Sequence, residues 1–163
     1  MDIYNIWNTI PSDQLQVLGL VALAMLLGAC VGFDRELADR PAGLRTHMLV
    51  AGAAALLVAL GDVLVAHFDG EINGPLLRSD PIRIIEAVVT GVAFLGTGTI
   101  IRGGTNDPVR GLTTAASLLF VAAIGICVAL LQFVIALGGT LFVLVTLRGL
   151  RCVDRWLRRS RSE

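Results

Sequence analysis

The stretch "AASLLFVAAIGICVALLQFVIALGGTLFVLVTL", from Ala115 to Leu147, contains no charged residue. One helix of that length would run roughly 50 Å, whereas the hydrocarbon core of a bilayer is about 30 Å thick. Two helices joined by a tight turn fit the core better. Gln132 is the most polar residue near the middle, so the turn is predicted at residues 130–132. A single, strongly tilted helix is the alternative.

The rest of the chain has the same character. Of its 163 residues, 55% are hydrophobic and 16% are charged, with a mean hydropathy of +0.79. A soluble domain would carry about a quarter charged residues. Further apolar spans lie at about 15–33, 47–68 and 81–101. We therefore predict an all-α, polytopic transmembrane helix bundle with five spans, or four if residues 115–147 form one helix.

Polar residues and prolines indicate where the spans begin. Thr46 is placed to cap the second span, because a threonine hydroxyl accepts from the free N–H groups of a first turn. Asp80 can cap the third span, and Pro81 fits its first position, where a missing N–H costs nothing. The same pair of residue types recurs at Asp107-Pro108, before the fourth span.

Small residues inside the spans suggest close packing. Gly28 and Gly32 form a GxxxG pair that lets another helix approach closely, although small residues are common in membrane helices. The cysteines Cys30, Cys127 and Cys152 fit neither a metal motif nor a disulfide framework. We interpret them as small packing residues.

The distribution of arginine sets the orientation, because cytoplasmic loops of membrane proteins are rich in basic residues. With five spans, eleven arginines fall in the 34–46 loop, the 102–114 loop and the tail, against two on the other side. We expect an external interfacial segment over 1–14, a transmembrane domain over 15–147 and a basic cytoplasmic tail over 148–163. The tail is either a basic helix on the inner leaflet or a stop-transfer anchor.

The stretch "FDRELADRPAGLRTH", from Phe33 to His47, places six charges between two apolar spans. Glu36 with Arg40 and Arg35 with Asp39 are spaced four apart, so the first helix is predicted to extend out of the bilayer to Arg40, before the proline. A solvated positive-inside loop explains the arginines. It does not explain three acids so near the membrane, which favours a paired polar cluster at the cytoplasmic mouth of the bundle.

The motifs "DRELADRPAGLRTHMLV", "GVAFLGTGTIIRGG" and "VRGLTTAASLLFVAAIG" closely resemble the MgtC/SapB family of bacterial inner-membrane proteins. The resemblance runs from about Leu15 to Leu147 and implies five spans with an outside N-terminus. Family members known as MgtC are linked to growth at low magnesium and to survival inside macrophages. They are thought to act on membrane energetics, including inhibition of the F-type ATP synthase. They add a cytoplasmic ACT-like domain, which this chain, ending soon after Leu147, is expected to lack.

The resemblance marks the polar residues of both motifs. In the first these are Asp34, Arg35, Glu36, Arg40, Pro41, Gly43, Arg45, Thr46 and His47; in the second they are Gly96, Gly98, Arg102, Arg110, Gly111, Thr113 and Thr114. Both motifs are predicted on the cytoplasmic side. We expect one site there, with Asp34 and Glu36 opposed to Arg102 and Arg110 and with hydroxyls from Thr113 and Thr114.

Glu86 is separate, about one turn inside the outer end of the third span. It either pairs with Arg83 or faces the bundle interior as an ion or proton site. Asp34, Glu36 and Glu86 are the candidate magnesium ligands, since Mg²⁺ prefers oxygen. Glu86 lies on the opposite side from the other two, so one three-carboxylate site is not expected. His47 could titrate near neutral pH, but a histidine at a helix start is more often a capping or interface residue.

Three functions fit these features. The first is a regulator of magnesium homeostasis and virulence-type stress that binds another inner-membrane complex, such as the F-type ATP synthase. The second is a transporter or channel for Mg²⁺ or a proton-coupled solute. The third is a structural subunit of a homo-oligomer, most simply a dimer. No nucleophile with a neighbouring base, zinc spacing or Walker loop is found, so we expect no enzyme, no cofactor other than a possible Mg²⁺, and no nucleic-acid partner.

Overall fold

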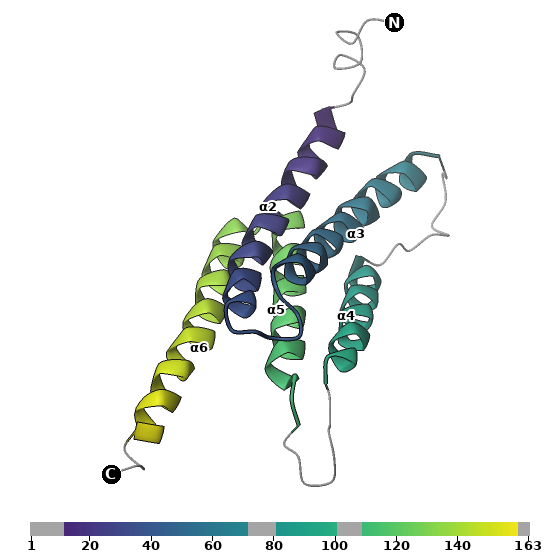
Figure 1. Cartoon of the computed structure of the whole chain (residues 1–163). Helices are drawn as coiled ribbons and strands as arrows, with labels where there is room; N and C mark the ends of the chain where they lie inside the picture. Colours follow the sequence, from purple (N-terminus) through teal and green to yellow (C-terminus); the bar gives the residue numbers. More distant parts are fainter. Residues whose placement is uncertain (1–11, 72–80, 101–108, 160–163) are drawn as a thin grey trace, which may run out of the picture.

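A computed structural model of the whole chain describes residues 12–71, 81–100 and 109–159, which form five helices without a β-strand among them. The helices are α2 (Ser12–Glu36), α3 (Leu44–Glu71), α4 (Pro81–Gly98), α5 (Leu112–Ala129) and α6 (Phe133–Arg159), as Figure 1 shows. The all-α prediction and the expected number of helices are confirmed.

The uncharged stretch forms two helices. Helix α5 ends at Ala129, and at the turn Leu131 adopts a left-handed φ of 58°. The Leu131 N–H donates to the Val128 carbonyl at 3.0 Å and the Gln132 N–H donates to the Cys127 carbonyl at 2.8 Å, which closes the helix end. The turn lies at the predicted residues, and the alternative of one long helix is wrong.

The helices have the length and apolar surface of a membrane bundle. Among the described residues, three stretches are long and apolar enough to cross a bilayer, and α6 adds a shorter one: Gln14–Glu36, Leu44–Leu64, Leu112–Ala129 and Phe133–Gly149. Large apolar side chains point outward, with Phe94 80% exposed and Val134 85% exposed. Such surface is unfavourable in water but not against lipid.

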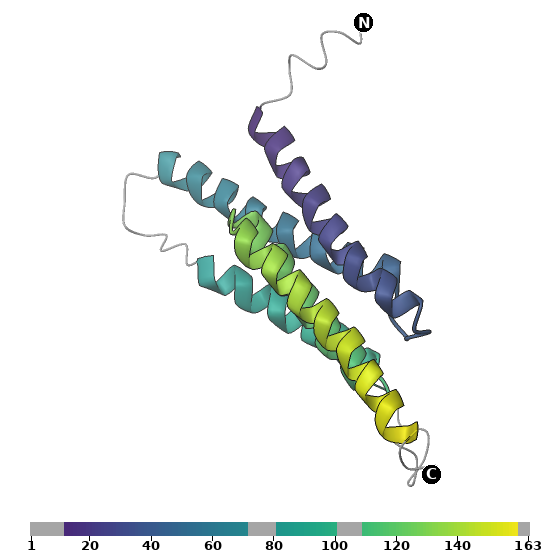
Figure 2. The same cartoon turned by 90° about the vertical axis from the view of Figure 1, so that its left-hand side faces the viewer.

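Helix α5 is the centre of the bundle, since it contacts each of the other four helices (Figures 1 and 2). Its buried side chains include Val121 and Ala122, and α3 meets its Gly125 with the Ala51 carbonyl and the Ala54 side chain. Because these side chains are short, the helix backbones come close together. Membrane helices associate through this kind of packing.

The GxxxG pair of α2 lies against the start of α3. A Cβ atom on Gly28 would lie 2.6 Å from the His47 carbonyl oxygen, and one on Gly32 would lie 2.8 Å from the Cα of Leu44. The GxxxG pair is expected to contact another helix, and in the structure that helix is α3. On the other side of α3, Gly125 of α5 lies against the Ala51 carbonyl, leaving no space for a side chain.

Two predicted helix ends are wrong. Helix α2 ends at Glu36 rather than Arg40, because Asp39 takes a left-handed φ of 50° and reverses the chain. The Arg40 N–H then donates to the Arg35 carbonyl at 3.2 Å, as in a Schellman motif. Helix α3 begins at Leu44, so Thr46 lies inside its first turn and is not the cap.

The structure also bears on the other predicted boundaries. Pro81 is the first residue of α4, as predicted, whereas Asp80 and Asp107-Pro108 lie outside the described residues. Helix α6 continues to Arg159, past the predicted boundary between membrane domain and tail. Most of the predicted segment 1–14 is likewise outside the described part.

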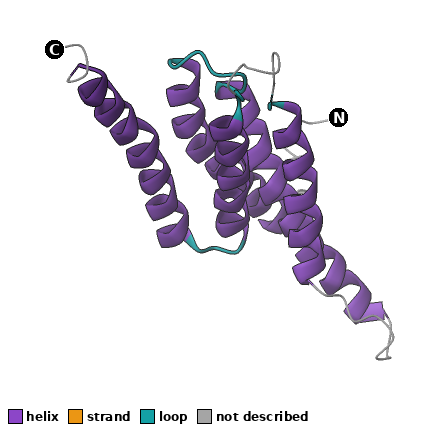
Figure 3. Cartoon of the chain, turned by 90° about the horizontal axis from the view of Figure 1, so that it is seen from below, coloured by secondary structure: helices purple, strands orange, loops and turns teal. Residues whose placement is uncertain are grey.

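The C-terminal ends of α2 and α4 and the N-terminal ends of α3 and α5 lie at one end of the bundle, seen from below in Figure 3. We call this the loop end. It carries both family-like motifs, so the topology brings together residues that are far apart in the sequence. The turn between α5 and α6 lies at the opposite end (Figure 1).

Candidate functional site

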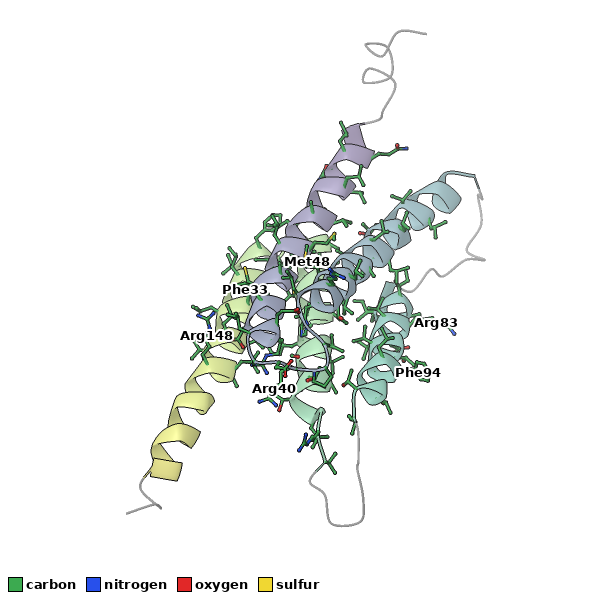
Figure 4. All side chains as sticks on the ribbon, in the orientation of Figure 1. Phe33, Arg40, Met48, Arg83, Phe94 and Arg148 are labelled. Carbon is green, nitrogen blue, oxygen red and sulfur yellow. The ribbon has the colours of Figure 1, made fainter. Side chains whose placement is uncertain are left out.

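Asp34, in the last turn of α2, is a buried carboxylate held between two arginines. Its Oδ2 accepts from Arg35 Nη2 at 2.6 Å, and its Oδ1 accepts from Arg148 Nε at 3.1 Å. Asp34 and Arg35 are both buried, whereas Arg148 reaches in from α6 and is itself largely exposed (Figure 4). A buried charge is tolerated only when it is paired in this way. The pair with Arg148 therefore joins α2 to α6.

The Glu36 side chain caps the start of α3. Its Oε2 accepts from the Leu44 N–H at 2.9 Å, so a side chain from α2 satisfies a free donor of the next helix. Gly43 lies directly against this carboxylate, and a Cβ there would collide with it. The predicted pairing of Glu36 with Arg40 is replaced by this cap, because α2 ends before the two residues can share a helix face.

His47 is a fully buried residue of α3 whose side chain faces α5. Its Nδ1 lies 2.8 Å from the Gly43 carbonyl, and its Nε2 lies 2.9 Å from the Ser117 hydroxyl. A carbonyl oxygen only accepts, so Nδ1 carries a hydrogen. The Ser117 hydroxyl is also 2.8 Å from the Thr114 carbonyl, to which it can donate. The chain of polar groups from Gly43 to Thr114 thus connects the loop before α3 with α5.

The remaining polar residues of the two motifs are distributed unevenly. Thr114 is buried beside Ser117, while Arg40, Arg45, Arg110 and Thr113 are exposed. Arg102, the other expected partner of the acids, lies outside the described residues. The structure thus gathers Asp34, Arg35, Glu36, His47 and Thr114 at the loop end, with Arg148 as the additional cation.

Three of the predicted structural glycines meet neighbouring atoms. Gly111 precedes α5 with a φ of 92°, where other residues are strained, and it lies against the Thr99 carbonyl. Gly96 packs on Ala115, with a Cβ position 3.3 Å from that of the alanine. Gly43 lies against Glu36, as described above. Gly98 has open space around it.

Glu86 lies on the outward face of α4 and is exposed. The opposite face of α4 packs inward through Val88, Val92 and Gly96. In the described part of the chain, no three metal-ligating side chains come together. Asp34 is paired with arginines, Glu36 caps a helix and Glu86 is on a separate surface, so these three carboxylates do not form a magnesium site in this conformation.

Sequence reasoning missed three residues of interest. Arg148 was counted only as part of the basic tail, and its distance from Asp34 in sequence gave no signal. The sequence pattern does not single out Ser117, although a serine three positions after Thr114 indicates a polar helix face. Asp62 was omitted from the membrane carboxylates, yet it lies exposed within the Leu44–Leu64 span.

Comparisons with known proteins show which family the chain belongs to. A model described as the MgtC family matches residues 21–156. Protein MgtC of Salmonella typhimurium is 42% identical over 128 residues, which cover 78% of this chain and 49% of that protein. Protein SapB of Bacillus subtilis is 32% identical over 146 residues, covering 90% of this chain and 60% of that protein.

Protein SrpB of Synechococcus elongatus is 36% identical over 164 residues, covering 94% of this chain and 87% of that protein. The chain thus spans about half the length of MgtC but most of the length of SrpB. No solved structure matches it. With the family model covering nearly all of the described helices, the chain belongs to the MgtC family.

Proposed function

We propose that this protein is a regulator in the bacterial inner membrane that acts in magnesium homeostasis by binding another integral membrane complex. Family membership supports the magnesium-related role, which the resemblance to MgtC implies together with virulence-type stress. The observation that carries the proposal is the position of Glu86, an exposed acid on the outer surface of α4, the predicted third span.

The outward face of α4 presents one polar group in need of a partner. Glu86, Thr90 and Thr97 are all exposed on this face. The threonine hydroxyls are satisfied within the helix, since Thr90 donates to the Glu86 carbonyl at 2.7 Å and Thr97 to the Ala93 carbonyl at 2.9 Å. Within the described residues, no ion pair joins the Glu86 carboxylate to an arginine.

A carboxylate facing lipid is costly unless it meets a polar partner. A basic or hydrogen-bonding side chain from another membrane subunit would supply one. A two-fold contact between identical copies through this face would bring two Glu86 side chains together, because such an interface uses the same patch twice. A different protein is therefore the better partner for this face, and the F-type ATP synthase is the candidate that the MgtC resemblance suggests.

Inverted membrane vesicles containing the F-type ATP synthase, with and without this protein, test the proposal. We expect the wild-type protein to reduce ATP-driven proton pumping and Glu86→Leu to restore it. Asp62→Leu is the matched control, because Asp62 is an exposed acid on a different membrane helix. Unchanged pumping with the wild-type protein, or equal restoration by both variants, would contradict the proposal.

Transport of Mg²⁺ or protons is the alternative function. Its support is weaker, because Asp34 is neutralised by arginines and the Thr99 hydroxyl donates to the Gly96 carbonyl at 2.8 Å instead of lining a path. Flux of each ion into proteoliposomes holding the purified protein distinguishes the two. Flux that Glu86→Gln abolishes would establish transport and overturn the regulator. The regulator requires neither catalysis nor a cofactor.

A further inference from the structure

A groove between α3 and α4 has features of a lipid-binding site. Its volume is about 780 Å³, and most of its lining is apolar. Small residues in its middle, including Ala53, Ala87 and Gly91, leave it open to the outside. We propose that this groove binds an anionic phospholipid, with the lipid phosphate at Arg45 and an acyl chain lying along the groove.

The charges of the groove favour an anionic head group. Arg45 lines it at the loop end, with the Thr46 hydroxyl beside it, whereas Arg83 lines it near the start of α4, at the opposite end. Both arginines are exposed, and within the described residues neither has a carboxylate partner. Arginine binds phosphate through paired N–H groups. The head group belongs at Arg45 because Arg45 lies in the first turn of α3, at the loop end where the lipid–water boundary is expected.

The length of the groove suits one leaflet. From Arg45 to Leu57 it follows α3 for about 18 Å, at 1.5 Å per residue. Half of a bilayer core is about 15 Å thick. An acyl chain that starts at the level of Arg45 and ends at the bilayer midplane therefore covers most of the length of the groove.

The groove differs from the Glu86 face, because Glu86 is absent from its lining. The lipid site and the proposed partner face are thus separate surfaces of α4.

Spin-labelled lipids test the proposal on the full chain, reconstituted in phosphatidylcholine vesicles with a trace of labelled phosphatidylglycerol or labelled phosphatidylcholine. We expect the wild-type protein to immobilise phosphatidylglycerol in preference. Arg45→Gln should reduce that preference about fivefold, the effect of one basic residue at an anionic membrane surface. Arg110→Gln is the matched control, because Arg110 is exposed near the loop end but does not line the groove.

A variant that fills the groove distinguishes lipid binding in the groove from lipid binding elsewhere on the protein. Gly91→Leu projects into open space, so it should fold and should reduce immobilisation of both labelled lipids. Gly19→Leu, at another open position on α2, should leave both unchanged. Inorganic phosphate at the same concentration should not displace the label, because it lacks the acyl chain.

Three results would overturn the proposal. Equal losses with Arg45→Gln and Arg110→Gln would mean diffuse attraction to the basic end. Unchanged lipid binding with Gly91→Leu would mean that the groove is not the site. Efficient crosslinking between copies through Ala53→Cys, prevented by Gly91→Leu, would show that a second chain fills the groove.

Discussion

The Nε2 of His47 and the hydroxyl of Ser117 lie 2.9 Å apart, although seventy positions separate them in the sequence. Both side chains are buried, so neither can exchange this hydrogen bond for one to water. His47 is also bound to the Gly43 carbonyl at 2.8 Å. The contact therefore fixes the start of α3, and the loop before it, on the central helix α5.

Removing the serine hydroxyl should weaken this junction. Ser117→Ala leaves His47 Nε2 buried without a partner, and we expect a loss of roughly 1 kcal/mol in the free energy of unfolding, as for other hydrogen bonds between membrane helices. Unfolding of the purified protein in mixed detergent micelles measures it. Thr113→Ala, which removes an exposed hydroxyl from the same helix, should change stability by less than about 0.5 kcal/mol. Equal losses of stability with Ser117→Ala and Thr113→Ala would argue against a stabilising contact between His47 and Ser117.

Neutralising Asp34 should lower the free energy of unfolding by more than Ser117→Ala does. Asp34→Asn leaves the buried Arg35 guanidinium without its counter-charge, and breaking a buried pair in this way costs about 3–5 kcal/mol. We expect a large fall in the thermal unfolding temperature. Asp39→Asn serves as the control, because Asp39 is exposed and asparagine also tolerates its left-handed backbone. A fall no larger than the control's would mean that Arg35 finds another partner.

Arg148→Gln tests the second cation separately. Because Arg148 is exposed while Arg35 stays paired with Asp34, we expect a smaller loss of stability than with Asp34→Asn. The effect should shrink at high salt, since an exposed ion pair is screened. Salt dependence of the unfolding temperature in the wild type and the variant measures this. A loss that is as large as that of Asp34→Asn and independent of salt would contradict the expectation.

A side chain at Gly28 should separate α2 from α3. Gly28→Val places a methyl-bearing carbon against the His47 carbonyl, and overpacking of this kind costs about 1–3 kcal/mol. The same substitution at Gly19 meets no atom within 4 Å, so it isolates the steric effect from the change in helix propensity. Detergent unfolding of the two variants gives the comparison, and equal stabilities would rule out close packing at Gly28.

The Glu36 carboxylate should slow hydrogen exchange in the first turn of α3. Glu36→Ala removes the acceptor of the Leu44 N–H, and loss of a helix cap costs about 1 kcal/mol. We expect faster hydrogen exchange at the Leu44 amide in this variant, with much of the protection kept in Glu36→Gln, whose amide oxygen still accepts. Exchange measured by mass spectrometry on peptides covering the loop resolves the effect. Unchanged exchange in Glu36→Ala would exclude the cap.

The helices and their turns were largely predictable from local sequence. Residues 115–147 contain no charge and exceed the length of one span, so the turn near Gln132 follows from bilayer thickness alone. Pro81 similarly predicts a helix start. The end of α2 was predicted too late, because the four-residue spacing of Glu36 and Arg40 favours a helix that Asp39 instead terminates by its left-handed backbone.

The sequence by itself determined the class of structure, since hydropathy and charge depend on composition along the chain, and it indicated which motifs matter. The pairings within the loop end were decided only by tertiary structure. His47 meets Ser117 because Gly28, Gly32 and Gly125 let α2, α3 and α5 pack at close range, and Asp34 meets Arg148 because α6 packs beside α2. No local pattern encodes these distances, because they depend on how the side chains of separate helices fill the space between them.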